Sequence, residues 1–203
     1  ISHAAQLLQE SQNLDKGDER LTDIIHNHSK RMNQVVANVL EMSRRARPDP
    51  QRINLLNHLK EFAESFCQSQ PEAALDIAVT PATTEIRMDP NQLNQALTNL
   101  VDNGIRYSQE NGNGPTVSLE GGIDPGSGRP FLNIVDSGQG VEEELVGSLF
   151  QPFTTSSRKG TGLGLYLSRE LCESNQAQLS YAPTESGGSC FRILFAHPDR
   201  LSA

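Results

Sequence analysis

Residues 89–107 read DPNQLNQALTNLVDNGIRY, and this stretch decides how the surrounding chain can fold. It predicts a long helix that begins directly after Asp89. A carboxylate suits the N-cap, and Pro90 then occupies the first helical position, where its missing N–H costs nothing. Beyond the cap, apolar residues recur at helical spacing and form one buried face: Leu93, Leu97, Leu100 and Ile105.

The other face of this predicted helix is rich in side-chain amides. Gln95, Asn99 and Asn103 follow at intervals of four residues, and Arg106 and Tyr107 continue onto the next turn. Asparagine is a poor residue for a helix interior. Amide oxygens suit a hard cation such as Mg²⁺, which keeps waters and phosphate oxygens as further ligands. The alternative interpretation is an ordinary solvated polar face.

A second candidate follows the apolar run at residues 131–135, which predicts a strand. Asp136 stands at its end, with Gly138 and Gly140 in the turn that follows. A carboxylate there can accept a hydrogen bond from an exocyclic amine such as that of adenine, and the glycines let the backbone approach a flat base. Asp-x-Gly is also common turn chemistry, so this signal alone is weak.

A third candidate is the sequence GTGLGL at residues 160–165, which leads into a predicted helix at residues 162–174. Glycine at every second position exposes backbone N–H groups, and the helix N-terminus adds a positive dipole end for phosphates. The motif lacks the Gly-Lys-Ser/Thr ending of a P-loop and does not fit a dinucleotide fingerprint.

The segment before residue 48 has a different pattern. Heptad spacing over residues 21–42, after a shorter apolar helix, predicts a helical hairpin that pairs with a second copy in a four-helix bundle. Pro48 and Pro50 cannot continue the helix. The expected domains are therefore a dimerisation hairpin at residues 1–47 and a second domain at residues 48–203.

Within the second domain, predicted helices and strands interleave without a regular βαβ repeat. This favours a two-layer α/β sandwich with a mixed sheet, preceded by the α-helical hairpin. The further elements expected are a helix at residues 55–66 and strands at residues 75–79, 85–88, 116–119, 179–181 and 190–195.

Composition excludes several classes of protein. A formal net charge of −8 disfavours general binding to nucleic acid, although local amides can still bind a small phosphate ligand. No apolar run approaches the length of a membrane span. Cys67, Cys172 and Cys190 lie far apart without metal-ligand spacing, which favours reduced thiols.

Taken in order, the asparagine helix, the Asp136 turn, the Phe150-Gln-Pro-Phe153 segment and the glycine-rich turn resemble the N, G1, F and G2 boxes of sensor histidine kinases. Those boxes define a catalytic ATP-binding domain of the superfamily shared with gyrase B, Hsp90 and MutL. Residues 162–177, GLGLYLSRELCESNQA, are further similar to the PilS type of kinase, which is associated with type IV pilus transcription. The resemblance implies a Bergerat-type fold that binds ATP and Mg²⁺.

The resemblance also implies roles for individual residues. Asn99 and Asn103 would hold Mg²⁺, with Asn103 the direct ligand, while Arg106 and Tyr107 would contact phosphate and nucleotide. Asp136 would bind the adenine amino group. The remaining residues would shape the base pocket or line the phosphates: Gly138, Gly140, Lys159, Gly160, Thr161, Gly162, Leu163 and Gly164.

A lid over residues 141–159 would cover the phosphates. Phe150 and Phe153 would anchor it, although either could be an ordinary core aromatic. Ser157 stands where many relatives carry a lysine, so Arg158 or Lys159 would take over its phosphate contact. Asn175 and Gln176 replace a common His-Gly pair at the next helix end, a second departure from the family pattern.

In this family a histidine beside an acidic residue accepts the phosphoryl group. None of the five histidines of this chain fits that pattern, and Ile1 matches a position just after the acceptor. The acceptor is therefore expected upstream, no catalytic residue is assigned, and the chain should bind ATP–Mg²⁺ without phosphorylating itself. The implied partners are a second copy through the hairpin and a PilR-like receiver domain, with no nucleic acid and no membrane contact. The implied location is the cytoplasmic portion of a bacterial inner-membrane sensor.

Two other functions stay open. Hydrolytic ATPases of the same superfamily place a glutamate one turn before the metal-binding asparagine, as the base that activates water. In this chain that position is Asn99, which cannot accept a proton. Asp102 lies about 100° around the helix from the face that carries Asn99 and Asn103. The other alternative is a dimeric interaction module with a degenerate nucleotide pocket, against which the intact boxes argue.

Overall fold

The computed structural model describes residues 47–155 and 160–199, together with Leu21, Thr22, Ile24, Ile25, Ser29 and Met32. The chain divides into two compact units, which we describe separately. The larger unit holds Arg47–Phe150 and the residues from Gly164 onward, and the smaller unit holds residues 1–46 with Gln151–Leu163. The six isolated residues are all helical, as the heptad pattern predicts for that stretch. The rest of the predicted hairpin and its pairing lie outside the described residues.

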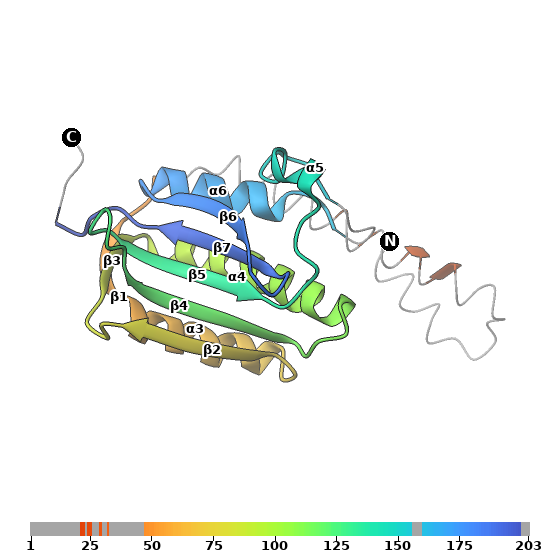
Figure 1. Cartoon of the computed structure of the whole chain (residues 1–203), viewed down its shortest axis with the longest axis horizontal. Coiled ribbons are helices and arrows are strands. Elements are labelled where there is room, and N and C mark those ends of the chain that lie inside the picture. Colours follow the sequence, from red (N-terminus) through yellow and green to blue (C-terminus); the bar gives the residue numbers. More distant parts are fainter. Residues whose placement is uncertain are drawn as a thin grey trace. The chain divides into compact units, whose positions relative to one another are not determined.

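The larger unit is a two-layer sandwich in which helices cover one face of a sheet (Figure 1). Strand order in the five-stranded sheet is β2-β4-β5-β7-β6. β2 pairs with β4 in parallel, and the other three pairings are antiparallel. The predicted mixed α/β sandwich is therefore confirmed. The strands are β2 (Ala74–Thr80), β4 (Thr116–Ile123), β5 (Pro130–Asp136), β6 (Gln178–Pro183) and β7 (Ser189–Leu194).

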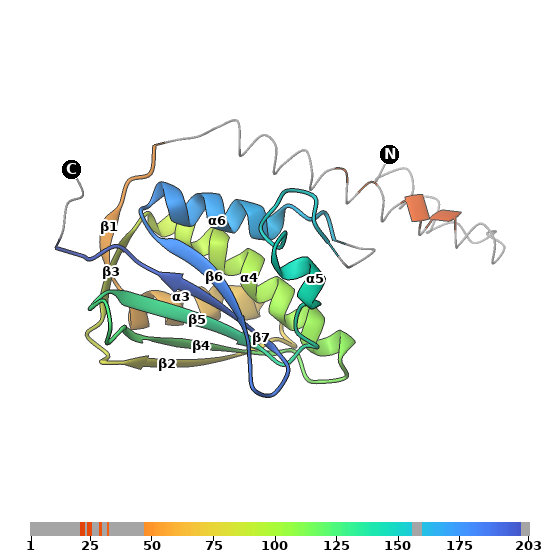
Figure 2. The ribbon, with the colours of Figure 1, turned by 45° about the horizontal axis from the view of Figure 1, so that its top comes forward.

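The helix layer contains three main helices, which lie on the same side of the sheet (Figure 2). These are α3 (Leu55–Ser69), α4 (Pro90–Glu110) and α6 (Gly164–Ser174). The start of α4 follows the sequence prediction, because Asp89 Oδ1 accepts hydrogen bonds from the backbone amides of Asn91 (2.9 Å) and Gln92 (3.2 Å). Within the described residues, no helix is both long enough and apolar enough to span a membrane.

The core lies between the two layers. Alternate residues of β5 are buried, so one face of this strand packs on the helices while the other is partly open to solvent. Helices contribute apolar side chains at three- and four-residue spacing, as an amphipathic helix does when it covers a sheet. Fully buried members include Leu55, Leu59, Leu93, Leu97, Leu100, Leu119 and Leu132.

Two elements were not predicted from the sequence. β1 (Gln51–Asn54) pairs antiparallel with β3 (Glu85–Met88) in a separate two-stranded sheet, and α5 (Glu143–Val146) is a single short helix after β5. β1 has no clear alternation of its own and depends on its distant partner. The predicted helix at residues 162–174 begins at Gly164, two residues later than expected.

Candidate functional site

The amide-rich face of α4 meets the first residue of α6. A Cβ atom placed on Gly164 would lie 3.8 Å from Cγ of Asn99 and 3.9 Å from Nδ2 of Asn103. The start of α6 therefore passes near both asparagine side chains, with room for no more than a methyl group between them. Since the first amides of a helix have no partner within that helix, this arrangement places N–H donors beside amide groups.

Arg106 extends the same face of α4. Its Nη2 donates a 2.8 Å hydrogen bond to Oδ1 of Asn103, and its guanidinium carbon lies 4.7 Å from the centre of the Tyr107 ring. Nε of Arg106 is buried without a hydrogen-bond partner among the described residues. A buried cationic donor that lacks an acceptor fits an anionic oxygen, such as that of a phosphate.

Asp136 ends β5 as a buried carboxyl group, with 5% of its surface exposed. Its Oδ1 accepts hydrogen bonds from the backbone amides of Gly138 (2.9 Å) and Ser189 (3.1 Å). Burial raises the pKa of Asp136 above its usual range, and the hydrogen bonds from Gly138 and Ser189 offset this only in part. The structure thus holds the carboxyl group in one orientation at the strand end.

Glycines allow α4 and the Asp136 turn to approach each other. A Cβ on Gly104 would lie 2.8 Å from Cγ2 of Val117 and 3.3 Å from Cβ of Asp136. One on Gly138 would lie 3.0 Å from both Cβ of Tyr107 and Oδ1 of Asp136. The structure therefore brings Tyr107 and Asp136 together around Gly138. Sequence reasoning missed Gly104, whose only signal was a glycine inside a strongly predicted helix.

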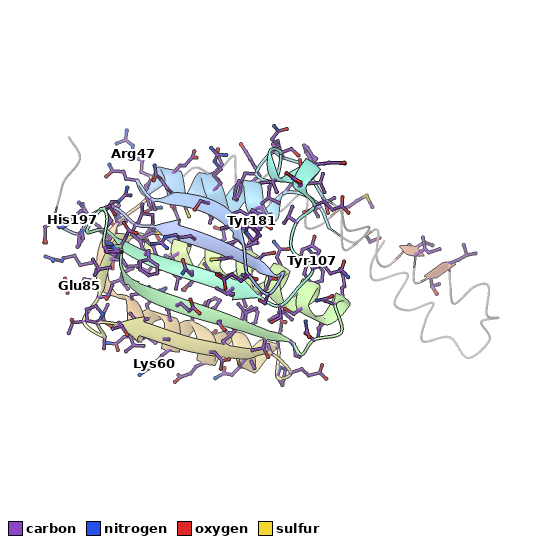
Figure 3. All side chains as sticks on the ribbon, viewed as in Figure 1. Arg47, Lys60, Glu85, Tyr107, Tyr181 and His197 are labelled. Atoms are coloured by element: carbon purple, nitrogen blue, oxygen red, sulfur yellow. The ribbon has the colours of Figure 1, made fainter. Side chains whose placement is uncertain are left out.

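The hairpin between β6 and β7 supports the same turn. Gly140 has φ +74°, and a Cβ there would lie 2.8 Å from the carbonyl oxygen of Gly187. A Cβ on Gly188 would overlap the carbonyl oxygen of Asp136. The hydroxyl group of Tyr181 accepts a 3.1 Å hydrogen bond from the Val141 amide. Tyr107 and Tyr181 are both labelled in Figure 3 and lie in the same half of the larger unit. Gly188 and Tyr181 were also missed, because their contacts depend on distant strands.

The two phenylalanines of the Phe150–Phe153 segment have different surroundings. Phe150 packs edge-on against Phe191, with ring centres 6.4 Å apart, and lies under the Arg169 guanidinium. It is therefore a core aromatic of the larger unit. Phe153 belongs to the smaller unit, is 67% exposed and has φ 66°, a conformation rare outside glycine.

The rest of the glycine-rich turn also belongs to the smaller unit. The Phe153 amide donates a 2.8 Å hydrogen bond to the carbonyl oxygen of Gly162, which has φ +70°. The Leu163 amide donates to Oγ1 of Thr161 at 3.3 Å. Gly160 is buried. Lys159, with Ser157 and Arg158, lies outside the described residues, so its phosphate contact stays a prediction.

Comparison with known proteins identifies the family to which this arrangement belongs. Residues 88–199 match the family described as "Histidine kinase-, DNA gyrase B-, and HSP90-like ATPase". The chain is 52% identical to the sensor protein kinase PilS of Pseudomonas aeruginosa over 204 residues, which cover 100% of this chain and 38% of that protein. It is 28% identical to the sensor histidine kinase ZraS of Salmonella typhimurium, over 85% of this chain and 37% of that protein. The chain thus spans less than two fifths of the length of these curated relatives.

Solved structures share the fold at low sequence identity. Full-length ShkA in complex with AMPPNP superposes with a TM-score of 0.68 at 19% identity, over 97% of this chain and 43% of that one. The nucleotide-free catalytic domain of the histidine kinase ThkA gives a TM-score of 0.62 at 21% identity, over 74% of this chain and 98% of that one.

Proposed function

Because this chain belongs to the family of histidine kinase-, DNA gyrase B- and HSP90-like ATPases, we propose that it is the ATP-binding catalytic part of a sensor histidine kinase of the PilS type. In this proposal it transfers the γ-phosphoryl group of ATP to a histidine nitrogen. The phosphoryl group then passes to an aspartate of a response regulator. The 52% identity to PilS supports control of type IV pilus genes as the output.

The observation that carries the proposal is the proximity of Gly164 to Asn99 and Asn103, whose side chains lie 3.8 and 3.9 Å from where a Cβ of residue 164 would be. Side-chain amide oxygens, which can bind Mg²⁺, thus lie near the backbone amides at the start of α6. The start of a helix is a common binding site for phosphates. The unpartnered Nε of Arg106 lies on the same helix. These donors and acceptors fit a magnesium nucleotide in charge and in kind.

Each residue then has a role. Asn103 would hold Mg²⁺ with Asn99 beside it, Arg106 would bind a phosphate oxygen, and Asp136 would accept a hydrogen bond from the adenine amino group. When bound, ATP–Mg²⁺ supplies the phosphoryl group and the metal charge that neutralises it during transfer. The other proposed contacts are Tyr107, Gly138 and Gly140 around the base, and Lys159, Gly160, Thr161, Gly162, Leu163 and Gly164 around the phosphates.

The acceptor histidine and the partners follow from the same proposal. None of the five histidines has an acidic neighbour in the sequence, so we propose that another histidine accepts the phosphoryl group. Residues 1–47 would belong to a dimerisation hairpin that pairs with a second copy. Among the described helical residues there, Leu21 (57%), Ile25 (42%) and Met32 (53%) are exposed and lie on the heptad seam. The second proposed partner is the receiver domain of a PilR-like regulator, which would take the phosphoryl group from the histidine. We further propose that the full protein is a membrane sensor and that this part of it lies in the cytoplasm.

The hydrolytic alternative is less well supported. A water-activating carboxylate would be needed one turn before Asn103, and Asn99 cannot accept a proton there. The nearest candidate, Asp102, accepts a 2.8 Å hydrogen bond from Nε2 of Gln70, the residue that caps the C-terminus of α3. This contact directs Asp102 toward α3 rather than toward Gly164.

Transfer in trans tests the proposal. The 203-residue chain is mixed with radiolabelled ATP, Mg²⁺ and the cytoplasmic part of P. aeruginosa PilS in which ATP binding has been abolished. We expect label on the added acceptor, none on the chain itself, and slow release of free phosphate. Rapid hydrolysis without an acceptor would support the ATPase, and no binding of ATP would support the degenerate module.

A further inference from the structure

One buried side chain joins the end of α6 to the start of α4. Asn175 follows the last residue of α6 and has 3% of its surface exposed. Its Oδ1 accepts a 2.9 Å hydrogen bond from the Asp89 amide, while its Nδ2 donates to Oε1 of Gln92 at 2.6 Å and to the carbonyl oxygen of Leu171 at 2.8 Å. A backbone amide can only donate and a carbonyl can only accept, so these partners fix which way the side-chain amide points. Among short side chains, only asparagine offers one acceptor and two N–H donors.

The other end of α6 lies beside the proposed nucleotide site. Gly164 begins α6, and a Cβ there would lie 3.8 and 3.9 Å from the side chains of Asn99 and Asn103. The two helices therefore run antiparallel. α6 has 11 residues, which is about 16 Å of helix. A regular helix of this length is a rigid element, so Asn175 at its end helps to set where its start lies along the amide-rich face of α4.

Asp89 connects this junction to the chain that enters the larger unit. One oxygen of its carboxylate, Oδ1, accepts from the first amides of α4, and the other, Oδ2, accepts a 3.0 Å hydrogen bond from the Asp49 amide. Asp49 is exposed and lies two residues after Arg47, where the larger unit begins. Asp89 thus contacts the entering segment through its side chain and Asn175 through its backbone amide.

We propose that Asn175 is a positioning residue for the nucleotide site and that it couples this site, through Asp89, to the entering segment at residues 47–50. The inference rests on the proposed binding of ATP–Mg²⁺ beside Gly164. Phosphates that bind at the start of α6 hold this helix in place, and Asn175 then holds Asp89 in the orientation that accepts the Asp49 amide. Coupling between two sites is reciprocal, so release of Asp49 weakens nucleotide binding by the factor by which the nucleotide strengthens the Asp49 hydrogen bond.

The first test separates positioning from stability. The 203-residue chain and Asn175→Ala are titrated with ATP–Mg²⁺ and with adenosine, which lacks the phosphates that bind at the start of α6. We expect the dissociation constant for ATP–Mg²⁺ to rise about tenfold in the variant, because displaced donors lose charge-assisted hydrogen bonds, and that for adenosine to change less than about twofold. Equal losses for both ligands, or no loss for either, would overturn the positioning role.

A core variant is the control for lost stability. Leu119→Ala, at a fully buried position of β4, destabilises the fold in another element. It should leave the ratio of the two dissociation constants at the wild-type value. A change in this ratio as large as that of Asn175→Ala would show that the selective loss reflects stability and not the position of α6.

The second test follows the Asp49 amide by NMR. We expect its proton to exchange with solvent more slowly when AMPPNP–Mg²⁺ is bound to the wild type. In Asn175→Ala the exchange should be severalfold faster without nucleotide, and nucleotide should no longer slow it. The nucleotide-free comparison tests the junction whether or not the chain binds ATP, and unchanged exchange there would overturn the coupling.

Asp89→Ser isolates the last step. Serine keeps one oxygen to cap α4 but lacks the second oxygen that accepts the Asp49 amide. Helix content should stay unchanged by circular dichroism, and ATP–Mg²⁺ affinity should fall by the factor by which nucleotide slows Asp49 exchange in the wild type. Unchanged affinity would show that the entering segment is not coupled to the site. If the wild type fails to bind ATP while Asn175→Ala still speeds Asp49 exchange, the junction stands and the proposed kinase function is contradicted.

Discussion

Nη2 of Arg106 donates a 2.8 Å hydrogen bond to Oδ1 of Asn103, which is the oxygen proposed to hold the metal. The two groups leave α4 one turn apart and on the same side, so each limits where the other can point. A change in the charge of Asn103 should therefore alter both the metal site and the phosphate-binding cation.

Asn103→Asp tests this coupling. The new carboxylate would form an ion pair with Arg106 and place a negative charge beside the phosphates. We expect ATP–Mg²⁺ affinity to fall about tenfold, which is roughly 1.4 kcal/mol, in isothermal titration calorimetry. Asn91→Asp, the same change at an exposed position in the first turn of α4, is the matched control and should bind normally. Unchanged affinity in Asn103→Asp would remove Asn103 from the site.

Asp136→Asn should weaken ATP binding and stabilise the fold. The asparagine oxygen can still accept from the amides of Gly138 and Ser189, but the side chain becomes a poorer acceptor for an adenine amino group. We expect ATP affinity to fall about tenfold, because the adenine amino group loses its best acceptor.

The stability effect of Asp136→Asn should depend on pH. Because burial raises the folded-state pKa of Asp136, the folded protein binds more protons than the unfolded chain between the two pKa values. The free energy of unfolding therefore falls as pH rises through that interval, and the buried charge costs stability at pH 7. The variant should melt at a higher temperature than the wild type at pH 7, and the gap should shrink toward pH 4. A constant gap would show that the carboxylate charge is not the cause.

Gly104→Ala should destabilise the protein although alanine favours helix by about 1 kcal/mol. The added methyl group would lie 2.8 Å from Cγ2 of Val117, which is fully buried. Overpacking of this kind costs about 1–3 kcal/mol. Denaturant unfolding of Gly104→Ala, Val117→Ala and the double variant forms a double-mutant cycle. The second substitution should recover part of the loss, and simple additivity would mean that the two residues do not compete for space.

Sequence reasoning predicted the elements whose signals are local. Asp89, Pro90 and the leucine spacing define α4 without reference to the rest of the chain. β1 could not be found in this way, because the strand that it pairs with, β3, is more than thirty residues away in the sequence. The four residues of α5 are too few to show a period.

The same distinction applies to the candidate site. Asn99 and Asn103 were found because asparagine is unusual in a helix interior, and Asp136 because it ends a predicted strand and precedes a glycine-containing turn. The contact of Gly104 with β4 and β5 was not predictable, because it depends on strand order and register.

Gly162→Ala and Gly187→Ala form a matched pair at positive φ. Both backbones are strained for alanine, at φ +70° and +93°. Only Gly162 is also crowded, because a Cβ there would lie 2.5 Å from the carbonyl carbon of Phe153, whereas nothing lies within 4 Å at Gly187. We expect ATP affinity to fall about tenfold in Gly162→Ala, because the added methyl group would push the Phe153 backbone away and break its hydrogen bond to Gly162. The affinity should change little in Gly187→Ala. Equal losses would show that backbone strain alone is responsible.

Gln176→Gly should stabilise the chain. Gln176 follows α6 with φ 61° and is exposed, so its side chain costs about 1–2 kcal/mol in a left-handed conformation that glycine adopts freely. Among the described residues, Gln176 hydrogen-bonds through its backbone, from its amide to the Glu173 carbonyl oxygen and from Arg129 to its own carbonyl oxygen, so both bonds survive the change. Part of the gain is lost because glycine adds entropy to the unfolded chain. A rise in melting temperature of about 2–4 °C is expected by calorimetry. Gln176→Ala, which shortens the side chain but keeps Cβ, should give no such rise. An equal rise in Gln176→Ala would mean that the atoms beyond Cβ, and not the strained backbone, cause the loss of stability.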